Sequence, residues 1–266
     1  MSVVAILLRL SVWMLPSLSA DQRQAIVDFE TGLFTTQVFD WRAGSLTSDG
    51  ALSGPRRLSA QPFCIGLNDP LGILPQMPGA CASASSGLDP SVFTLFTGWR
   101  HATRRARQAI ARGEAIFNTR SFVIDNVAGL NGGPADPVAG PIQGGTCTVC
   151  HNAPNAGDHT IAMPLDIGIA AAGRRTADLP LYTLRNTTTG ETTQTTDPGR
   201  AMITGRWNDI GKFKGPILRA LAARPPYFHN GSAATLDEVV DFYDTRFHIG
   251  LTAQDKADLV AFLNAL

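Results

Sequence analysis

The chain of 266 residues is long enough for one large domain or two modest ones, and its 44% hydrophobic content suffices for a buried core. Its 22 basic residues balance 22 acidic ones, so no overall field favours nucleic acid or an anionic membrane surface. Charged residues are only 17% of the chain, which also contains 26 glycines and 17 prolines. This composition favours long ordered loops over a helix-dense bundle.

The N-terminal segment is an imperfect leader. Its apolar run has no basic stretch before it, and Arg9 interrupts it. The run is too short and too broken to span a membrane. It is either a poor signal peptide or a sign that the chain begins partway through a longer gene product. Ser19 and Gln22 then have capping-box spacing, and the apolar pattern predicts a helix over about 20–34.

Residues 40–92 are predicted to form a loop-rich segment, called the belt below. Glycine and proline recur there too often for long regular elements. After the belt, a helix is predicted over about 99–117. Its arginines are interpreted as a solvated face, with docking of a redox partner as the alternative.

The C-terminal half is predicted to contain one hairpin and two helices. Strands over 182–186 and 191–195 flank a Thr-Thr-Thr-Gly turn. Capping boxes at Thr235 and Thr252 predict a helix to about residue 243 and a final helix over 252–266.

The segment Cys147-Thr148-Val149-Cys150-His151 has the Cys-x-x-Cys-His pattern of c-type haem attachment. This spacing sets two thiols on one turn, where they can bond the two vinyl-derived carbons of one porphyrin edge. The next residue, His151, then projects its imidazole toward the iron. Structural zinc is disfavoured because no second closely spaced Cys/His pair exists, and a thioredoxin-type pair because glycines precede the motif. The sequence predicts one haem c per chain.

The other two cysteines, Cys64 and Cys81, lie in the belt. In bacteria, haem is attached to such motifs outside the cytoplasmic membrane, where thiol pairs can be oxidised. A periplasmic or similar location and a Cys64–Cys81 disulfide, worth roughly 3 kcal/mol on a chain-entropy estimate, are therefore predicted. Two free buried thiols remain the alternative.

Taken together, several segments resemble the second haem domain of the bacterial di-haem cytochrome c peroxidase family, whose relatives include the methylamine-utilisation di-haem enzymes. The haem motif alone is generic, but its order with the other segments is specific. The segments that carry the resemblance are 112–117, 147–151, 213–219, 226–236 and 257–263.

The resemblance implies an all-α, cytochrome c-like domain with long loops and a small β-hairpin over 99–266. In such folds the first and last helices cross, a small residue such as Gly113 allows close approach, and aromatic residues such as Phe117 and Phe262 fill the contact. Residues 1–98 would be an N-terminal helix plus the belt, resembling the end of a first cytochrome domain. The family also holds a calcium ion, but no acidic cluster with the required oxygen density is seen here.

The resemblance also offers candidates for the iron ligand opposite His151. The family's electron-transfer haem takes a Met fourteen residues after the His of its Pro-Tyr-Phe-His segment, and here that position is Tyr243. The methylamine-utilisation relatives have tyrosine at the corresponding place. Met202 is the alternative ligand, and Met163 is the next candidate after it. For each of the three, plain core packing is the competing interpretation.

Charged residues of the same motifs are assigned roles by their chemistry. Lys214 and Arg219 are candidates to balance the haem propionates, because buried carboxylates need cationic partners. His229 is a candidate acid–base group near the haem pocket, should peroxide chemistry occur. His159 and His248 are expected to be surface or loop histidines.

The leading functional prediction is one-electron transfer by a single covalent haem c, with a small cytochrome or cupredoxin as redox partner. The alternative is a peroxidase-type haem oxidoreductase that acts with a second haem. The family's enzymes pass an electron from one haem to the other, and only one Cys-x-x-Cys-His occurs in this sequence. Neither nucleic-acid binding nor a membrane span is predicted.

Overall fold

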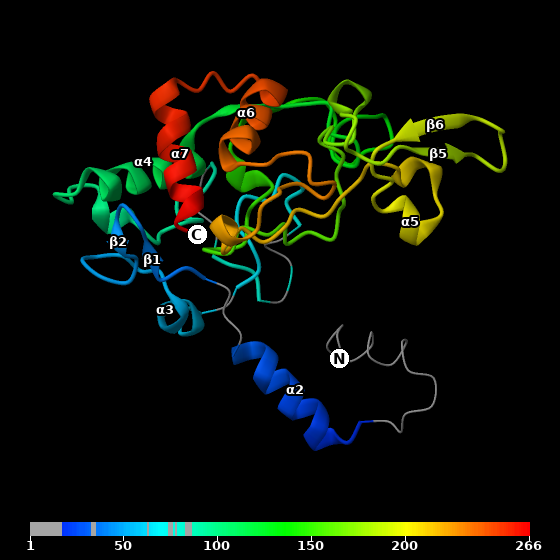
Figure 1. Cartoon of the computed structure of the whole chain (residues 1–266). Coiled ribbons are helices and arrows are strands. Elements are labelled where there is room, and N and C mark those ends of the chain that lie inside the picture. The colour runs from blue at the N-terminus through cyan, green and yellow to red at the C-terminus, as the bar shows by residue number, and fades with distance from the viewer. Residues whose placement is uncertain (1–17, 33–35, 63, 74–76, 78, 83–86) are drawn as a thin grey trace.

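The computed structural model describes residues 18–32, 36–62, 64–73, 77, 79–82 and 87–266. Helix α2 (Ala20–Gly32) lies apart from the main body in Figure 1. Its capping box is present, because the Gln22 N–H donates to Ser19 Oγ at 3.1 Å and the Ser19 N–H to Gln22 Oε1 at 2.9 Å. The leader at 1–17 and the predicted helix end at 33–34 lie outside the described residues.

Where the structure describes the belt, its helices and strands are all short, as its composition predicts. They are an antiparallel pair, β1 (Phe39–Asp40) with β2 (Gly44–Ser45), and the helix α3 (Pro55–Ser59). The predicted disulfide is confirmed: Cys64 and Cys81 are bonded. The belt contributes fully buried side chains to the same core as the helices that follow. The belt and the predicted cytochrome domain over 99–266 therefore share one core.

The predicted helix over 99–117 starts later than expected. A 3-10 turn, η2 (Thr97–Trp99), comes first, and α4 runs over Arg105–Thr119. Trp99 is fully buried, and its indole N–H donates to the Ser48 carbonyl of the belt at 3.2 Å. Because this core contact fixes the chain at Trp99, the helix begins only after Arg104, whose backbone is extended.

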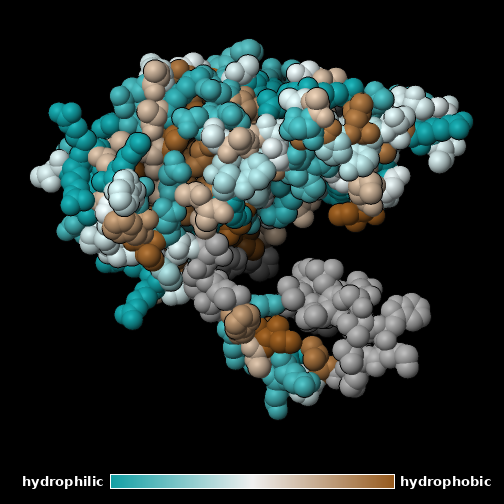
Figure 2. Space-filling model, in the orientation of Figure 1, coloured by the Kyte–Doolittle hydropathy of each residue, from teal (hydrophilic) through white to brown (hydrophobic). Residues whose placement is uncertain are grey.

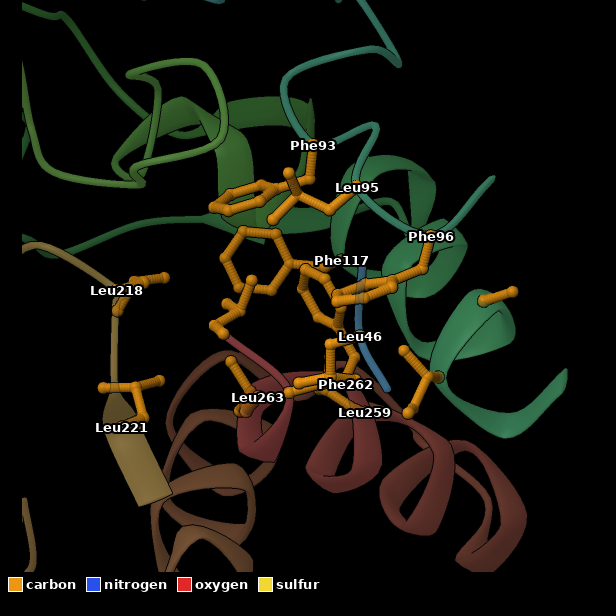
Figure 3. Packing of buried hydrophobic residues seen from close by; sticks show 14 of the residues in the cluster. Leu46, Phe93, Leu95, Phe96, Phe117, Leu218, Leu221, Leu259, Phe262 and Leu263 are labelled. Carbon is orange, nitrogen blue, oxygen red and sulfur yellow. The ribbon is translucent and has the colours of Figure 1, made fainter. Parts of the chain in front are cut away.

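Helix α4 packs closely against the last helix, α7 (Ala253–Asn264). A Cβ placed on Gly113 would lie 2.0 Å from the Asp258 carbonyl oxygen, so only glycine permits this approach. Beside it the Arg112 guanidinium donates to both Asp258 carboxylate oxygens, at 2.7 and 2.8 Å. Figure 3 shows Phe117 and Phe262 within this contact, their ring centres 5.7 Å apart. The predicted contact is thereby confirmed.

The remaining elements are short and joined by long loops. The predicted hairpin is confirmed as β5 (Tyr182–Arg185) with β6 (Thr192–Thr195), and a second pair, β3 (Phe122–Ile124) with β4 (Ile142–Gly145), was not predicted. Helix α6 runs over Leu236–Phe247, four residues further than expected, and ends where His248 is left-handed. The other short helices are η3 (Cys147–Val149), η4 (Ala172–Arg174), α5 (Ala201–Thr204), η5 (Trp207–Asp209) and η6 (Leu221–Ala223).

Buried apolar residues form two clusters. The first cluster joins the belt, α4 and α7, and includes Leu46, Phe93, Phe96, Trp99, Phe117, Leu259 and Phe262. The second cluster lies under β3, the loops after it and α6, and its buried members are Ile124, Val127, Leu130, Val149, Leu165 and Phe247. Among the helices of the described residues, none is both long and apolar enough to cross a membrane.

Candidate haem site

The Cys-x-x-Cys-His segment folds as a single tight turn between the two clusters. Its 3-10 turn η3 is closed by the N–H groups of Cys150 and His151, which both donate to the Cys147 carbonyl, at 3.3 and 3.0 Å. Both thiols are free and half-buried. Cys147 packs against the first cluster and Cys150 against the second, so the two sulfur atoms face the junction of the clusters.

Hydrogen bonds from the belt hold this turn in place. The Asn68 side-chain amide donates to Thr148 Oγ1 at 2.7 Å, and the Leu67 N–H donates to the Asn152 carbonyl at 2.8 Å. Just after the motif, Asn152 Oδ1 accepts from both the N–H and the hydroxyl of Thr160, which closes the loop 152–160. The belt therefore positions the site as well as covering it.

The imidazole of His151 is oriented as an iron ligand requires. Its Nδ1 lies 2.6 Å from the Gly157 carbonyl, which can only accept, so Nδ1 carries the proton and Nε2 keeps its lone pair. Burial lowers the pKa of His151 to about 4, which keeps the imidazole neutral at physiological pH. The Phe117 ring lies 5.9 Å away, centre to centre, and fixes one side of the imidazole.

The surroundings of the thiols fit a large apolar group. Burial raises the pKa of Cys147 to about 12 and that of Cys150 to about 11, so this environment disfavours thiolates. Cys147, Cys150 and His151 all keep accessible surface although they lie between two apolar clusters. A porphyrin bonded to both sulfur atoms would cover that surface. The residues present therefore fit a covalent haem c.

Of the three candidate ligands opposite His151, two pack against the cluster that the Cys150 side chain contacts. Tyr243 and Met163 pack against the second cluster, as Cys150 does. The pKa of Tyr243 is raised, first by burial and then by both cysteine thiols. Met202 is 74% exposed on α5, where Figure 2 shows apolar surface, and the structure does not bring it to the thiols.

The two basic residues predicted to balance propionates lie near the loop that follows His151. Lys214 is paired with Asp158 at 3.6 Å and its side chain is 58% exposed. The Arg219 Nε donates to the Asn155 carbonyl at 3.3 Å, and burial lowers the pKa of this guanidinium. Arg219 follows Leu218, which packs in the first cluster.

His229 is not brought to the thiols. Its side chain is 65% exposed, its Nδ1 lies 2.5 Å from Asp197 Oδ2, and its ring packs on Phe213 at 4.9 Å. The preceding residue, Phe228, has a positive φ of 64° and packs instead toward Tyr243. This backbone turn separates the two neighbouring side chains, because Phe228 is half-buried and His229 is exposed.

Two residues near the site were not predicted from sequence. His159 was expected at the surface, but it is 1% exposed, and its Nδ1 donates to the Cys150 carbonyl at 3.1 Å. The expectation was wrong because Gly215 lets the His159 side chain pack inside. Arg174 lies over the rings of Phe228 and Phe242, beside Tyr243. Neither residue belongs to a motif, so the sequence offers no clear signal for them.

A tight Cys-x-x-Cys-His turn with a neutral, oriented histidine defines the class of c-type haem proteins. Comparisons with curated proteins narrow this class. The chain is 37% identical to the cytochrome-c peroxidase IdrP1 of Denitromonas iodatirespirans over 136 residues, which cover 45% of this chain and 36% of that protein. It is 38% identical to the cytochrome c peroxidase of Escherichia coli strain K12 over 101 residues, 37% of this chain and 21% of that protein.

A third relative, the cytochrome c551 peroxidase of Nitrosomonas europaea, is 30% identical over 128 residues, 47% of this chain and 31% of that protein. The predicted resemblance to the bacterial cytochrome c peroxidase family is therefore confirmed. The chain spans only about a third of the length of the curated relatives it matches. No family model and no solved structure matches the chain.

Proposed function

We propose that this chain is a haem c-binding part of a peroxidase-type oxidoreductase, with an all-α, cytochrome c-like fold elaborated by long loops and a hairpin. The observation that carries the proposal is the His151 imidazole, neutral and held at Nδ1 by Gly157 beside two free thiols. The names of the relatives favour the peroxidase-type function over the simple electron carrier that the sequence favoured.

Each residue of the site has a separate role in this proposal. Cys147 and Cys150 would anchor the porphyrin through thioether bonds, and His151 Nε2 would bind the iron. When bound, haem c supplies one-electron redox chemistry. The two apolar clusters would shield a bound haem from water, which would strengthen electrostatic interactions near it. The residue opposite His151, Tyr243 or Met163, would then set the reduction potential.

The wider setting is also part of the proposal. The haem of this chain would exchange electrons with a second haem and with a small cytochrome or cupredoxin donor. Covalent haem attachment and the Cys64–Cys81 disulfide both favour a location outside the cytoplasmic membrane, such as the periplasm. Electron transfer by a lone haem remains the second candidate, because the sequence contains a single Cys-x-x-Cys-His.

Covalent haem binding is tested by producing the chain in a host that matures c-type cytochromes. The expected result is one haem that stays attached on denaturation, read by mass spectrometry and by the pyridine haemochrome spectrum. The variant C147S/C150S is expected to lose the attachment, while C64S/C81S keeps it. A wild-type protein that folds without covalent haem would refute the proposal.

The two candidate functions are separated by a peroxide-reduction assay with a reduced cytochrome as electron donor. The haem-loaded chain is measured alone and together with the product of the neighbouring upstream gene. Turnover that disappears in C147S/C150S supports the peroxidase-type function. A fully loaded chain that accepts electrons but gives no peroxide turnover in either arrangement is instead a carrier.

A further inference from the structure

Arg174 is a partly buried arginine whose guanidinium has no carboxylate partner among the described residues. Its side chain makes neither a hydrogen bond nor an ion pair with any described residue, and its Nε is buried. Other arginines are paired with carboxylates: Arg107 with Asp49, Arg112 with Asp258, Arg120 with Asp255, Arg200 with Asp209 and Arg246 with Asp125. A partly desolvated cation without a counter-ion is costly, so its position calls for a ligand.

The guanidinium of Arg174 lies one aromatic layer from the candidate haem pocket. Its central carbon is 4.4 Å from the Phe242 ring centre and 5.7 Å from that of Phe228. These rings lie 5.3 and 6.3 Å from the Tyr243 ring, which packs against the same cluster as the Cys150 thiol. The cation is therefore on the α6 side of the site.

The backbone that carries Arg174 is held from several directions. Ile167 packs against the second cluster, and its carbonyl accepts from Arg246 Nε at 3.1 Å. The Ile169 carbonyl accepts from the Asn230 side-chain amide at 3.4 Å. The segment is thus fixed between the thiol pocket and the hairpin, and the turn η4 follows directly. Arg174 is presented by a scaffold and is not on a free loop.

The chemistry of haem supplies the missing anion. A haem bonded through its vinyl-derived edge carries two propionates on a different edge of the ring, and buried carboxylates need cationic partners. Lys214 already has a carboxylate partner in Asp158, and Arg219 already donates to the Asn155 carbonyl. We propose that Arg174 binds a haem propionate on the α6 side of the pocket, an inference that rests on the proposed haem function.

Burial gives this pairing a consequence for the potential. Burial lowers the pKa of Arg174, because the surroundings disfavour an isolated charge. A carboxylate facing the guanidinium would raise this pKa again. Removing the cation would favour the ferric state, because one positive charge near the iron is lost. It would also raise the pKa of the propionate that it had stabilised.

The test compares R174Q with R175Q, in which the neighbouring arginine loses the same charge. Arg175 is the matched control because its Nη2 donates to the Gln194 carbonyl of β6, away from Phe242. Midpoint potentials are titrated across pH. We expect R174Q to have a lower potential than wild type above the propionate pKa, and its pH-dependent step to move to higher pH. R175Q is expected to follow the wild type.

A second variant keeps the test decisive if R174Q does not accumulate. R174K retains the charge but not the planar fork, so the potential is expected to stay near that of wild type while the propionate carboxylate band shifts in redox-induced infrared difference spectra. An unchanged band in R174K, or a potential in R174Q equal to that of R175Q, would overturn the assignment. Failure of the haem function itself is distinguishable, because it appears as absent covalent haem in the wild type.

Discussion

At the scale of single residues, the site leaves two side chains competing for the position opposite His151. Tyr243 and Met163 pack against the same cluster as the Cys150 thiol. An oxygen ligand and a thioether give different ferric spectra, and we expect Tyr243 to be the ligand. Tyr243→Phe is therefore expected to change the ferric spectrum. Met163→Leu is expected to leave the spectrum unchanged. Absorption and magnetic circular dichroism of the haem-loaded variants make the measurement.

The control for this prediction is Met202→Leu, because Met202 is 74% exposed on α5. Its spectrum is expected to match the wild type. A weak methionine-to-iron band in the wild-type ferric protein, lost in Met163→Leu, would reject the tyrosine and identify the thioether as the ligand.

Another single residue, Glu114, is expected to make the free energy of unfolding depend on pH. Its buried carboxylate accepts from the Phe96 N–H at 2.7 Å and the Thr97 hydroxyl at 2.6 Å, and burial raises its pKa from the usual 4.5. The folded state therefore binds this proton more tightly than the unfolded state. The contribution of Glu114 is full below the ordinary carboxyl pKa and is lost as pH rises through the raised value.

Glu114→Gln is expected to flatten this part of the pH dependence, since the amide does not titrate. The measurement is the free energy of unfolding, from urea titrations, at a series of pH values from acid to neutral. Glu191→Gln, at the exposed hairpin turn, serves as the control and is expected to keep the wild-type profile. Parallel profiles for wild type and Glu114→Gln would contradict the argument.

At the scale of elements, the contact between α4 and α7 depends on the absence of one side chain. A methyl group on Gly113 would lie 2.0 Å from the Asp258 carbonyl oxygen and 2.7 Å from Phe262 Cβ. The helices would have to separate, so Gly113→Ala is expected to lower the free energy of unfolding by about 1–3 kcal/mol despite the better helix propensity of alanine. Urea denaturation of the haem-loaded protein measures this loss.

Gly133→Ala is the matching substitution at an open position. A Cβ there meets only the Asp136 carboxylate, at 3.8 Å, which is an ordinary contact. Its unfolding free energy is expected to stay within about 0.5 kcal/mol of wild type. Equal stabilities of the two variants would show that α4 and α7 are not held at this distance in solution.

The elements that the sequence predicted well are those with local signals. The capping residue Thr252 bonds the Asp255 N–H, and the Tyr182–Thr195 hairpin has its turn residues in place. The start of α4 was missed because Trp99 is fixed by a belt residue about fifty positions away in the sequence. The pair β3–β4 was missed because two glycines in β4 weaken any strand pattern.

The candidate site divides in the same way. Cys147, Cys150 and His151 were predictable because their chemistry follows from spacing within five residues. Arg174 lies near the pocket because a segment distant in sequence, α6, brings Phe242 against it. His159 reaches the Cys150 carbonyl because the loop between these two residues folds back on itself. No local pattern reports such proximity, so the structure was needed to find them.

At the scale of the whole molecule, the belt and the two clusters form one arrangement around the candidate haem. The belt supplies core residues to the first cluster and hydrogen bonds to the turn that bears the thiols. The second cluster has far fewer fully buried members, so its own packing stabilises it less. A porphyrin bonded to one thiol from each side would join the two clusters.

This arrangement predicts that haem attachment protects the two clusters unequally. In the variant C147S/C150S, amide hydrogen exchange is expected to accelerate most around the second cluster, in β3 and at the Phe247 end of α6, because the smaller cluster loses the larger share of its packing. Exchange in α4 and α7 is expected to change less. Mass spectrometry of peptic fragments from loaded and variant proteins resolves these elements.

The belt disulfide provides the complementary control. C64S/C81S keeps the haem and is expected to lose roughly 3 kcal/mol of stability through loop entropy, with faster exchange in the belt. Because Cys64 packs against the first cluster, which also contains Leu236 and Val240 of α6, the element expected to be unaffected is β3 of the second cluster. If C147S/C150S accelerated exchange uniformly across both clusters, the chain would unfold as one unit, and the haem would stabilise the fold as a whole and not the junction between its two clusters.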